Sequence, residues 1–190
     1  MNEPDLVHDD RTGLVLGAIQ LESSNFDARP AGIAIDVLVI HAISLPPDCF
    51  GGDYVQALFT NRLDIGADPF FEEIAGLRVS SHFYIDRKGD LFQFVSTRNR
   101  AWHAGVSSFR NRERVNDFSI GVELEGCDAL PFEAVQYRSL SALTHCLQSS
   151  FPEITVQNIV GHSDIAPDRK TDPGPCFDWQ RYHGLLQPRK

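Results

Sequence analysis

The sequence predicts one α/β domain, of the mixed α+β type, in which helices flank a central mixed β-sheet. Its 190 residues suit a single domain that is large enough to bury its own hydrophobic core. Short β-branched runs alternate with segments of helical spacing, in the order strand, helix, hairpin, strand, helix. This order lacks the regular repetition of a parallel βαβ array, so we expect strands of both directions in the sheet.

The elements can be assigned in chain order. Residues 1–22 show no hydrophobic period and are expected to form a variable, loosely packed arm, which leaves residues 23–190 as the folded domain. Residues 35–43, IDVLVIHAI, are apolar on both alternating faces, and this predicts an interior strand. Residues 53–63 place apolar side chains at helical spacing behind Asp53, a candidate N-cap.

The second half of the chain contains the clearest patterns. A β-hairpin is predicted for residues 78–95, where RVSSHFYI and LFQFV flank the turn sequence DRKGD. Residues 118–126 alternate between apolar and polar side chains, so Glu123 and Glu125 share the polar face of a strand. Residues 131–151 carry apolar side chains at three- and four-residue steps and predict a helix that packs on the sheet.

Composition and charge exclude several classes of protein. The formal net charge of -9 argues against binding to nucleic acid or to an anionic membrane. No segment has the apolar length of a membrane span, and the acidic start MNEPDLVHDD lacks the features of a signal peptide. We therefore expect a cytoplasmic protein of the soluble globular class, with no obligate protein partner evident.

The four cysteines are predicted to be free thiols. Cys49, Cys127, Cys146 and Cys176 lie far apart and show no C-x-x-C spacing. A cysteine hydrolase would need one of these thiols beside a histidine, and nothing in their spacing favours that chemistry.

Two histidines at predicted strand ends point to a metal site. His41 lies near the end of one apolar run, and His162 follows another, the short run NIV. A catalytic zinc takes three protein ligands and leaves a fourth position open. The spacing leaves the third ligand undecided among Asp164, Asp168 and Asp172, with His82 and His103 as rival ligands. The alternative interpretation of this region is a solvated surface loop with ordinary ion pairs.

Other residues could support hydrolysis at such a site. Glu123 or Glu125 could take a proton from water, although a polar sheet face would also explain them. Lys170 could stabilise an oxyanion, although single lysines are more often surface charges. Residues 98–114 place five arginines around Trp102 and another aromatic residue. This segment suits a carboxylated, sugar-bearing ligand, or else is an exposed loop kept soluble by its charge.

Several stretches resemble one known family. VIHAISLPP, RAWHAGVSSF, NDFSIGVELEG and GHSDIAPDRKTDPGPCFDW together are similar to the AmpD-type cytoplasmic amidases. These belong to the zinc N-acetylmuramoyl-L-alanine amidases, which are related to the peptidoglycan-recognition proteins. The resemblance runs from about residue 24 to the C-terminal FDWQRYHGLL, so residues 23–190 are expected to form a zinc amidase domain.

The resemblance implies a role for individual residues. It implies that His41, His162 and Asp172 bind Zn²⁺, that Glu123 assists the attacking water, and that Lys170 stabilises the oxyanion. Glu125 would then be a structural carboxylate. The implied reaction is hydrolysis of the amide between N-acetylmuramic acid and L-alanine, preferably in 1,6-anhydro muropeptides during cell-wall recycling. In this family the activity lowers the muropeptide signal that induces β-lactamase.

The same resemblance implies substrate contacts and one alternative function. Arg78, Trp102 and Arg114 match substrate-contact positions of the family. Two positions depart from its usual pattern, since Ala42 stands where asparagine is frequent and Phe70 where tyrosine is common. The alternative function is a non-catalytic module that binds muropeptides, as in recognition proteins that have lost a metal ligand.

Overall fold

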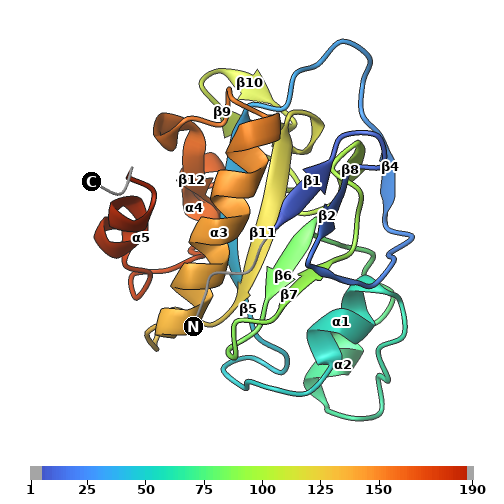
Figure 1. Cartoon of the computed structure of the whole chain (residues 1–190). Coiled ribbons are helices and arrows are strands. Elements are labelled where there is room, and N and C mark those ends of the chain that lie inside the picture. Colours follow the sequence, from blue (N-terminus) through green and yellow to red (C-terminus); the bar gives the residue numbers. More distant parts are fainter. Residues whose placement is uncertain (1–5, 188–190) are drawn as a thin grey trace.

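A six-stranded mixed sheet forms the centre of the computed structural model, which describes residues 6–187 (Figure 1). In sheet order the strands are β12 (Ile159–Gly161), β5 (Val37–Ile43), β11 (Ser119–Glu125), β6 (Phe83–Ile85), β7 (Leu91–Gln93) and β3 (Ile19–Gln20). The pairs β12–β5, β5–β11, β11–β6 and β7–β3 are parallel, whereas β6 and β7 form an antiparallel hairpin. The predictions of a mixed sheet, of the interior strand and of the hairpin are thereby confirmed.

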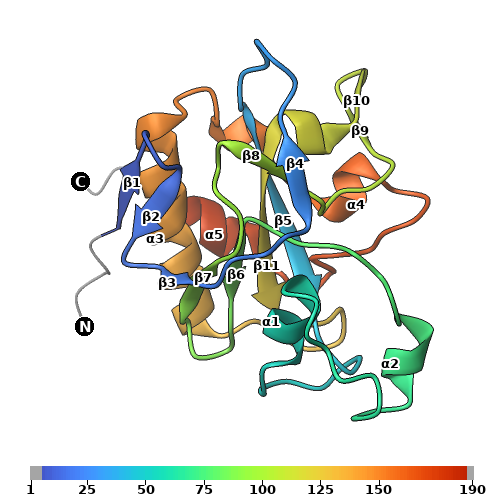
Figure 2. The same ribbon diagram turned by 90° about the vertical axis from the view of Figure 1, so that its right-hand side faces the viewer.

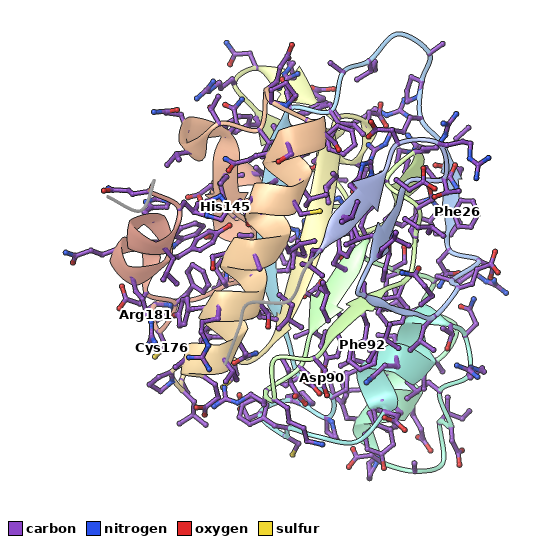
Figure 3. All side chains as sticks on the ribbon, viewed as in Figure 1. Phe26, Asp90, Phe92, His145, Cys176 and Arg181 are labelled. Carbon is purple, nitrogen blue, oxygen red and sulfur yellow. The ribbon has the colours of Figure 1, made fainter. Side chains whose placement is uncertain are left out.

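One face of the sheet is covered by α3 (Ala134–Ser150), with α5 (Trp179–Leu185) beside it (Figure 1). The apolar residues of this layer form one cluster from the sheet and α3: Leu38, Ile40, Ile120, Val122, Leu124, Leu140, Leu143 and Leu147. Figure 3 labels His145 on α3 and Arg181 on α5. His145 donates to the carbonyl of Leu185 over 3.3 Å, and the Arg181 guanidinium lies 4.8 Å from the centroid of the Tyr137 ring. The predicted helix over 131–151 is therefore present and packs on the sheet as expected.

The opposite face of the sheet carries α4 (His162–Ile165) and several loops. Figure 2 shows α3 and α4 on opposite sides of β5. A second apolar cluster lies here, built from Val37, Val39, Phe118, Val160 and Ile165 with two neighbours. All seven residues of β11 are buried, so the face that carries Glu123 and Glu125 is not a solvent-exposed polar face. Loop residues cover this face of β11, and the ring of His103 lies against Gly121.

A third cluster packs α1 (Tyr54–Phe59) and α2 (Phe70–Glu73) beside the sheet. The predicted helix over 53–63 is real but shorter, because the chain turns at Asn61, whose φ is 57°. Asp53 occupies the N-cap position, yet its side chain makes no capping hydrogen bond. Helix α2 was not predicted, since four residues carry too little periodicity.

The N-terminal segment is better packed than predicted. Strands β1 (Val7–Asp9) and β2 (Leu14–Leu16) form a hairpin, and β3 extends the main sheet. Val15 is fully buried, and its N–H donates to Oε1 of Gln93 over 2.7 Å. The expectation of a loosely packed arm is therefore wrong for residues 7–20, whose two- and three-residue strands are too short to show a period. Residues 1–5 lie outside the described part of the chain.

Short elements complete the fold. Strand β4 (Phe26–Ala28) pairs with β8 (Asn99–Ala101), and β9 (Ser108–Phe109) pairs with β10 (Arg112–Glu113). Two 3₁₀ turns are η1 (Val115–Asp117) and η2 (Val156–Asn158). The four cysteines are free, as predicted. Among residues 6–187, no helix has the length and apolar character needed to cross a membrane.

Candidate metal centre

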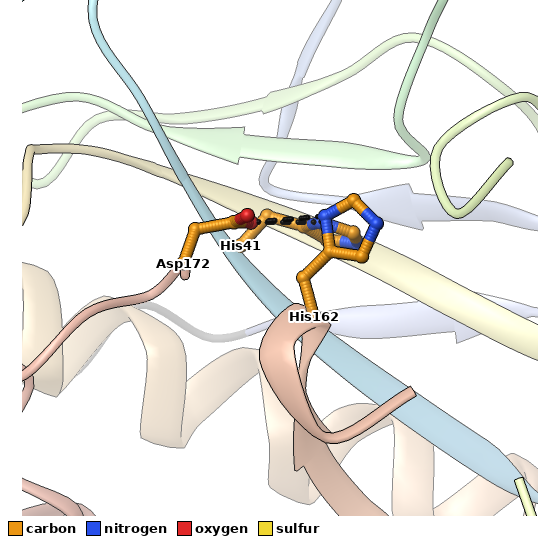
Figure 4. A group of neighbouring side chains, drawn as sticks. All are labelled: His41, His162 and Asp172. Carbon is orange, nitrogen blue, oxygen red and sulfur yellow. Dashed lines mark hydrogen bonds and ion pairs between the residues drawn. The ribbon is translucent and has the colours of Figure 1, made fainter. Parts of the chain in front are cut away.

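Three side chains meet on the face opposite α3, and each comes from a different part of the chain (Figure 4). His41 lies on β5, His162 begins α4 directly after β12, and Asp172 precedes Pro173 in the following loop. Nδ1 of His41 is 2.9 Å from Nδ1 of His162 and 3.2 Å from Oδ2 of Asp172. Nδ1 of His162 is 3.1 Å from the same Oδ2. Three potential ligand atoms thus face one point.

The parallel register explains why the histidines meet. Gly161 of β12 is paired with Ile40 of β5. The residues that follow this pair, His162 and His41, therefore lie side by side at the same end of the sheet. The carboxyl ends of neighbouring parallel strands are where α/β sheets commonly bind ligands. The N–H of Ser163 donates to the carbonyl of Asp172 over 2.9 Å, which brings the far end of the loop back to α4.

The structure separates the three candidate aspartates. Oδ2 of Asp164 accepts the N–H of Gly161 over 2.7 Å, so this carboxylate closes the start of α4. Asp168 is exposed. Within residues 6–187, Asp172 is the aspartate that joins His41 and His162.

The Nε2 atoms of both histidines have hydrogen-bond partners that favour an unprotonated Nδ1, the form that can bind a metal. Nε2 of His162 lies 3.3 Å from the carbonyl of Ala104 and can donate only in the tautomer that leaves Nδ1 unprotonated. Nε2 of His41 lies 2.9 Å from Nδ1 of His103. Two imidazole nitrogens and a carboxylate oxygen, with room for a fourth ligand, are the donor set of catalytic zinc sites. The three electron-rich atoms lie so close together that a cation between them would remove their mutual repulsion.

The ionisation states also suit a metal. Burial lowers the pKa of His41 to about 4, which keeps its imidazole neutral at physiological pH. Burial alone would raise the pKa of Asp172, but the adjacent imidazoles of His162 and His41 outweigh this effect and hold the pKa below its ordinary value. Neutral imidazole and ionised carboxylate are the forms that bind metal ions.

Glu123 lies beside this group because β11 pairs with β5 in parallel register, with Glu123 directly opposite His41. Its Oε1 is 3.9 Å from Nδ1 of His41. Its Oε2 is buried, and within residues 6–187 it has no hydrogen-bond partner. Burial raises the pKa of Glu123 well above its ordinary value, and the charge of Asp172 adds to this rise. An unpartnered buried carboxylate oxygen of this kind is suited to hold a water molecule or a proton.

Glu125, on the same face, has a different role. Its Oε1 accepts the N–H of Gly51, and its Oε2 accepts the N–H of Arg87. Both oxygens therefore bind loops to the end of β11, in agreement with the structural role that the family resemblance implies for Glu125.

Lys170 lies in the loop between His162 and Asp172 and is half-buried. A cavity of about 450 Å³ beside the group is lined by Lys170, Asp172, Ala42, Cys127 and others. The positive charge of Lys170 opposes the rise in the pKa of Glu123. Ala42, one of the two unusual positions, also borders this cavity, whereas Phe70 packs against Phe71 in α2.

The predicted substrate residues are not gathered in one cavity. Arg78 is exposed and lines a cavity of about 200 Å³ near α1 and α2. Arg114 is exposed and lines another, of about 790 Å³, together with Arg169. Trp102 is half-buried next to His103. Their roles as substrate contacts stay predictions.

The arginine-rich segment 98–114 is largely engaged within the protein. Arg100 joins Asp27 and Asp117, and Arg112 bonds to Asp36. The other three also have partners in the protein: Arg98 contacts the carbonyls of Asp10 and Arg11, Arg110 that of Gln157, and Arg114 the carboxylate of Asp117. The idea of a cluster of arginines free to bind a carboxylated ligand is therefore weakened, because these guanidinium groups already hold loops together.

Sequence reasoning did not anticipate the contacts that support the group from outside. Nη2 of Arg169 donates to the carbonyls of Ala104 and Val106, over 2.7 and 2.8 Å, and so links the loop before Asp172 to the loop after His103. His103 was considered only as a rival ligand, and it lies instead behind His41. No spacing in the sequence could have placed either contact, since each joins segments more than 60 residues apart.

A buried His–His–Asp group lies beside Oε2 of Glu123, which has no hydrogen-bond partner within residues 6–187, on a mixed sheet flanked by helices. This combination is typical of a metal-dependent hydrolase. The sequence profile of the family described as N-acetylmuramoyl-L-alanine amidase matches residues 31–175, and the chain belongs to this family. The predicted family and enzyme class are thereby confirmed.

Individual relatives agree with this assignment. The chain is 52% identical over 174 residues to the 1,6-anhydro-N-acetylmuramyl-L-alanine amidase AmpD of Escherichia coli, covering 92% of this chain and 94% of that protein. The crystal structure of a selenomethionine AmpD derivative superposes with a TM-score of 0.89 at 49% identity, over 93% of this chain and 98% of the other. The E. coli amidase AmiD, solved with anhydro-N-acetylmuramic acid-L-Ala-D-γ-Glu-L-Lys, gives a TM-score of 0.58 at 29% identity, over 95% and 65% of the two chains.

Proposed function

We propose that this protein hydrolyses the amide bond between N-acetylmuramic acid and L-alanine in muropeptides, with the 1,6-anhydro form preferred, during cell-wall recycling. The observation that carries the proposal is the convergence of His41, His162 and Asp172 beside the unpartnered Oε2 of Glu123. The AmpD relative is named for this reaction, and the AmiD structure holds such a substrate. A small muropeptide is therefore the proposed binding partner.

We further propose that His41, His162 and Asp172 hold Zn²⁺, as their donor atoms and ionisation states allow. The chemistry that zinc supplies at such a site is Lewis acidity, which polarises a carbonyl and makes water easier to deprotonate. Arg78, Trp102 and Arg114 are proposed to contact the substrate. A cytoplasmic location and a role in lowering the signal for β-lactamase induction complete the proposal.

Glu123 would move the proton during the reaction. As the water oxygen bonds to the amide carbon, Oε2 takes one proton from that water. When the carbon–nitrogen bond breaks, the same carboxyl returns a proton to the L-alanine nitrogen, which leaves as an amine. A carboxyl whose pKa is raised by burial is suited to both steps near neutral pH.

Lys170 would stabilise the charge that develops on the carbonyl oxygen. Lys170 lines the same cavity as Asp172, and its positive charge opposes the rise in the pKa of Glu123. A fixed positive charge acts most strongly on an oxyanion where water is partly excluded.

The test is release of tripeptide from 1,6-anhydro-muramyl tripeptide, followed by mass spectrometry. The protein is assayed as purified, after chelation, and after zinc is added back. We expect release that chelation abolishes and zinc restores. If metal-loaded protein binds the muropeptide without cleaving it, the chain is a recognition module, and Ala42, at the edge of the cavity, is the first position to revert to asparagine.

A further inference from the structure

A line of polar side chains leads away from the metal centre behind His41. Nε2 of His41 lies 2.9 Å from Nδ1 of His103, and Nε2 of His103 lies 3.2 Å from Oγ of Ser119. The two rings meet nearly at right angles, with an interplanar angle of 87°. His103 therefore contacts His41 on the side opposite the His162 and Asp172 contacts.

Two placements of protons suit neutral rings in this arrangement, and metal binding selects one of them. If Nδ1 of His41 is to present a lone pair to a metal, its proton must be on Nε2 and must be donated. Nδ1 of His103 can accept that proton only when His103 carries its own proton on Nε2. That second N–H then donates to the hydroxyl oxygen of Ser119, so both imidazole N–H groups have an acceptor.

The position of the His103 ring is built into the sheet. A Cβ atom placed on Gly121 of β11 would lie 2.5 Å from Cγ of His103 and 2.6 Å from its Nδ1. The backbone of Gly121 does not have a positive φ, so glycine is required here for space and not for conformation. Ser119, two residues earlier on the same strand, points to the same face.

We propose that His103, seated on Gly121 and bonded to Ser119, is a positioning residue that fixes the tautomer and ring orientation of His41 and thereby sets the affinity of the site for a divalent metal. This inference rests on the proposed function in taking Zn²⁺ as the ligand. Outer contacts of this kind typically change metal affinity by about 10- to 100-fold when they are removed.

The experiment compares four variants of the full chain. His103→Leu removes the acceptor, whereas His103→Gln offers an amide oxygen to His41 and an amide N–H to Ser119. Ser119→Ala removes only the last hydroxyl. Its matched control is Ser81→Ala, because Ser81 is also fully buried, and its hydroxyl has no hydrogen-bond partner within residues 6–187.

Two measurements are made on each variant. Competition with a chromophoric chelator gives the dissociation constant for Zn²⁺. Long-range ¹H–¹⁵N NMR on the metal-free protein shows which nitrogen of His41 carries the proton. We expect His103→Leu to bind Zn²⁺ about 10- to 100-fold more weakly and to lose the Nε2–H tautomer. His103→Gln recovers most of the affinity, Ser119→Ala gives a smaller loss, and Ser81→Ala matches the wild type.

Equal zinc affinity and an unchanged His41 tautomer in His103→Leu would overturn the inference. If that variant does not fold, Ser119→Ala and Gly121→Ala decide, since the first loosens His103 and the second displaces its ring without altering its chemistry. A wild-type protein that binds no zinc would contradict the proposed function, and the NMR comparison would still decide whether His103 fixes the His41 tautomer.

Discussion

At the scale of single residues, the metal centre depends on which atom each side chain offers and on what occupies its other atoms. Asp164 and Asp172 are both close to His162 in the sequence, but one caps a short helix and the other faces the histidines. The chemical type of a residue does not distinguish these roles, because the difference lies in the hydrogen bonds that the folded loop makes available.

Asp172→Ala is expected to lower the zinc content of the purified protein by at least about tenfold, because it removes one of the three ligand atoms together with its negative charge. Atomic emission spectroscopy on desalted protein measures this directly. Asp168→Ala is the control, since Asp168 is exposed in the same loop, and it should keep its zinc. Unchanged metal content in Asp172→Ala would refute the ligand assignment.

Glu123→Gln is expected to keep the metal and to lower kcat by roughly 10²- to 10⁴-fold, the usual contribution of general acid–base catalysis. Glu125→Gln should instead leave kcat unchanged and destabilise the fold. Glu125 accepts hydrogen bonds from two backbone N–H groups, so its replacement should lower the free energy of unfolding without changing the catalytic step. Steady-state kinetics and urea denaturation on the two variants separate these effects. Equal turnover in Glu123→Gln and wild type would remove Glu123 from the mechanism.

At the scale of elements, sequence patterns predict long elements well and short ones poorly. The strand around His41 and the helix over 131–151 have enough residues to show a period, and both are present. Strands of two or three residues, such as β3 and β9, carry no such period. The position of His162 after an apolar run identified it as a strand-end residue, but the choice of Asp172 needed the family resemblance, because the loop has no repeating pattern.

The arginine-rich segment shows a second limit of sequence analysis. Its charges suggested a surface for an anionic ligand, yet Arg100 and Arg112 are paired with carboxylates from distant segments, Asp27 and Asp36. Local composition gives the charges of one segment, but the ion-pair partners that the fold brings from distant segments cannot be predicted from it. Charge clusters in loops are therefore weak predictors of ligand sites.

Val15→Ala is expected to lower the free energy of unfolding by about 1–3 kcal/mol, because a fully buried side chain in the main core is truncated. Leu16→Ala is the matched control: this neighbour is 61% exposed and should change the stability by less than about 0.5 kcal/mol. Chemical denaturation measures both. A cost for Val15→Ala as small as that for Leu16→Ala would show that the N-terminal hairpin does not contribute to the folding unit.

At the scale of the whole molecule, buried neutral histidines make stability depend on pH. His82 is fully buried against β11, accepts the N–H of Gly121 on Nδ1, and donates from Nε2 to the carbonyl of Asn99. Burial lowers its pKa well below the ordinary value of 6.5, and the charge of Arg29 adds to this effect. Below pH 6.5 the unfolded chain therefore binds a proton at this residue that the folded chain does not.

Comparison of wild type with His82→Gln isolates this contribution. The free energy of unfolding of the wild type should fall relative to the variant by about 1 kcal/mol for each pH unit below 6.5, until the lowered pKa of the folded state is reached. Urea denaturation of both proteins at about pH 7.5, 6 and 5 measures this difference. A difference that stays constant over this range would mean that His82 titrates normally in the folded protein.

The distribution of the proposed metal ligands along the chain has a kinetic consequence. His41 belongs to an interior strand of the sheet, whereas His162 and Asp172 stand at the two ends of one surface segment, which Arg169 fastens to a neighbouring loop. Local opening of that segment would withdraw two donors together and leave the third in place, at the cost of exposing Ile165 of the second apolar cluster. If the proposed metal is bound, we expect its lifetime to follow how often the 162–172 segment opens, so that metal exchange can occur without global unfolding.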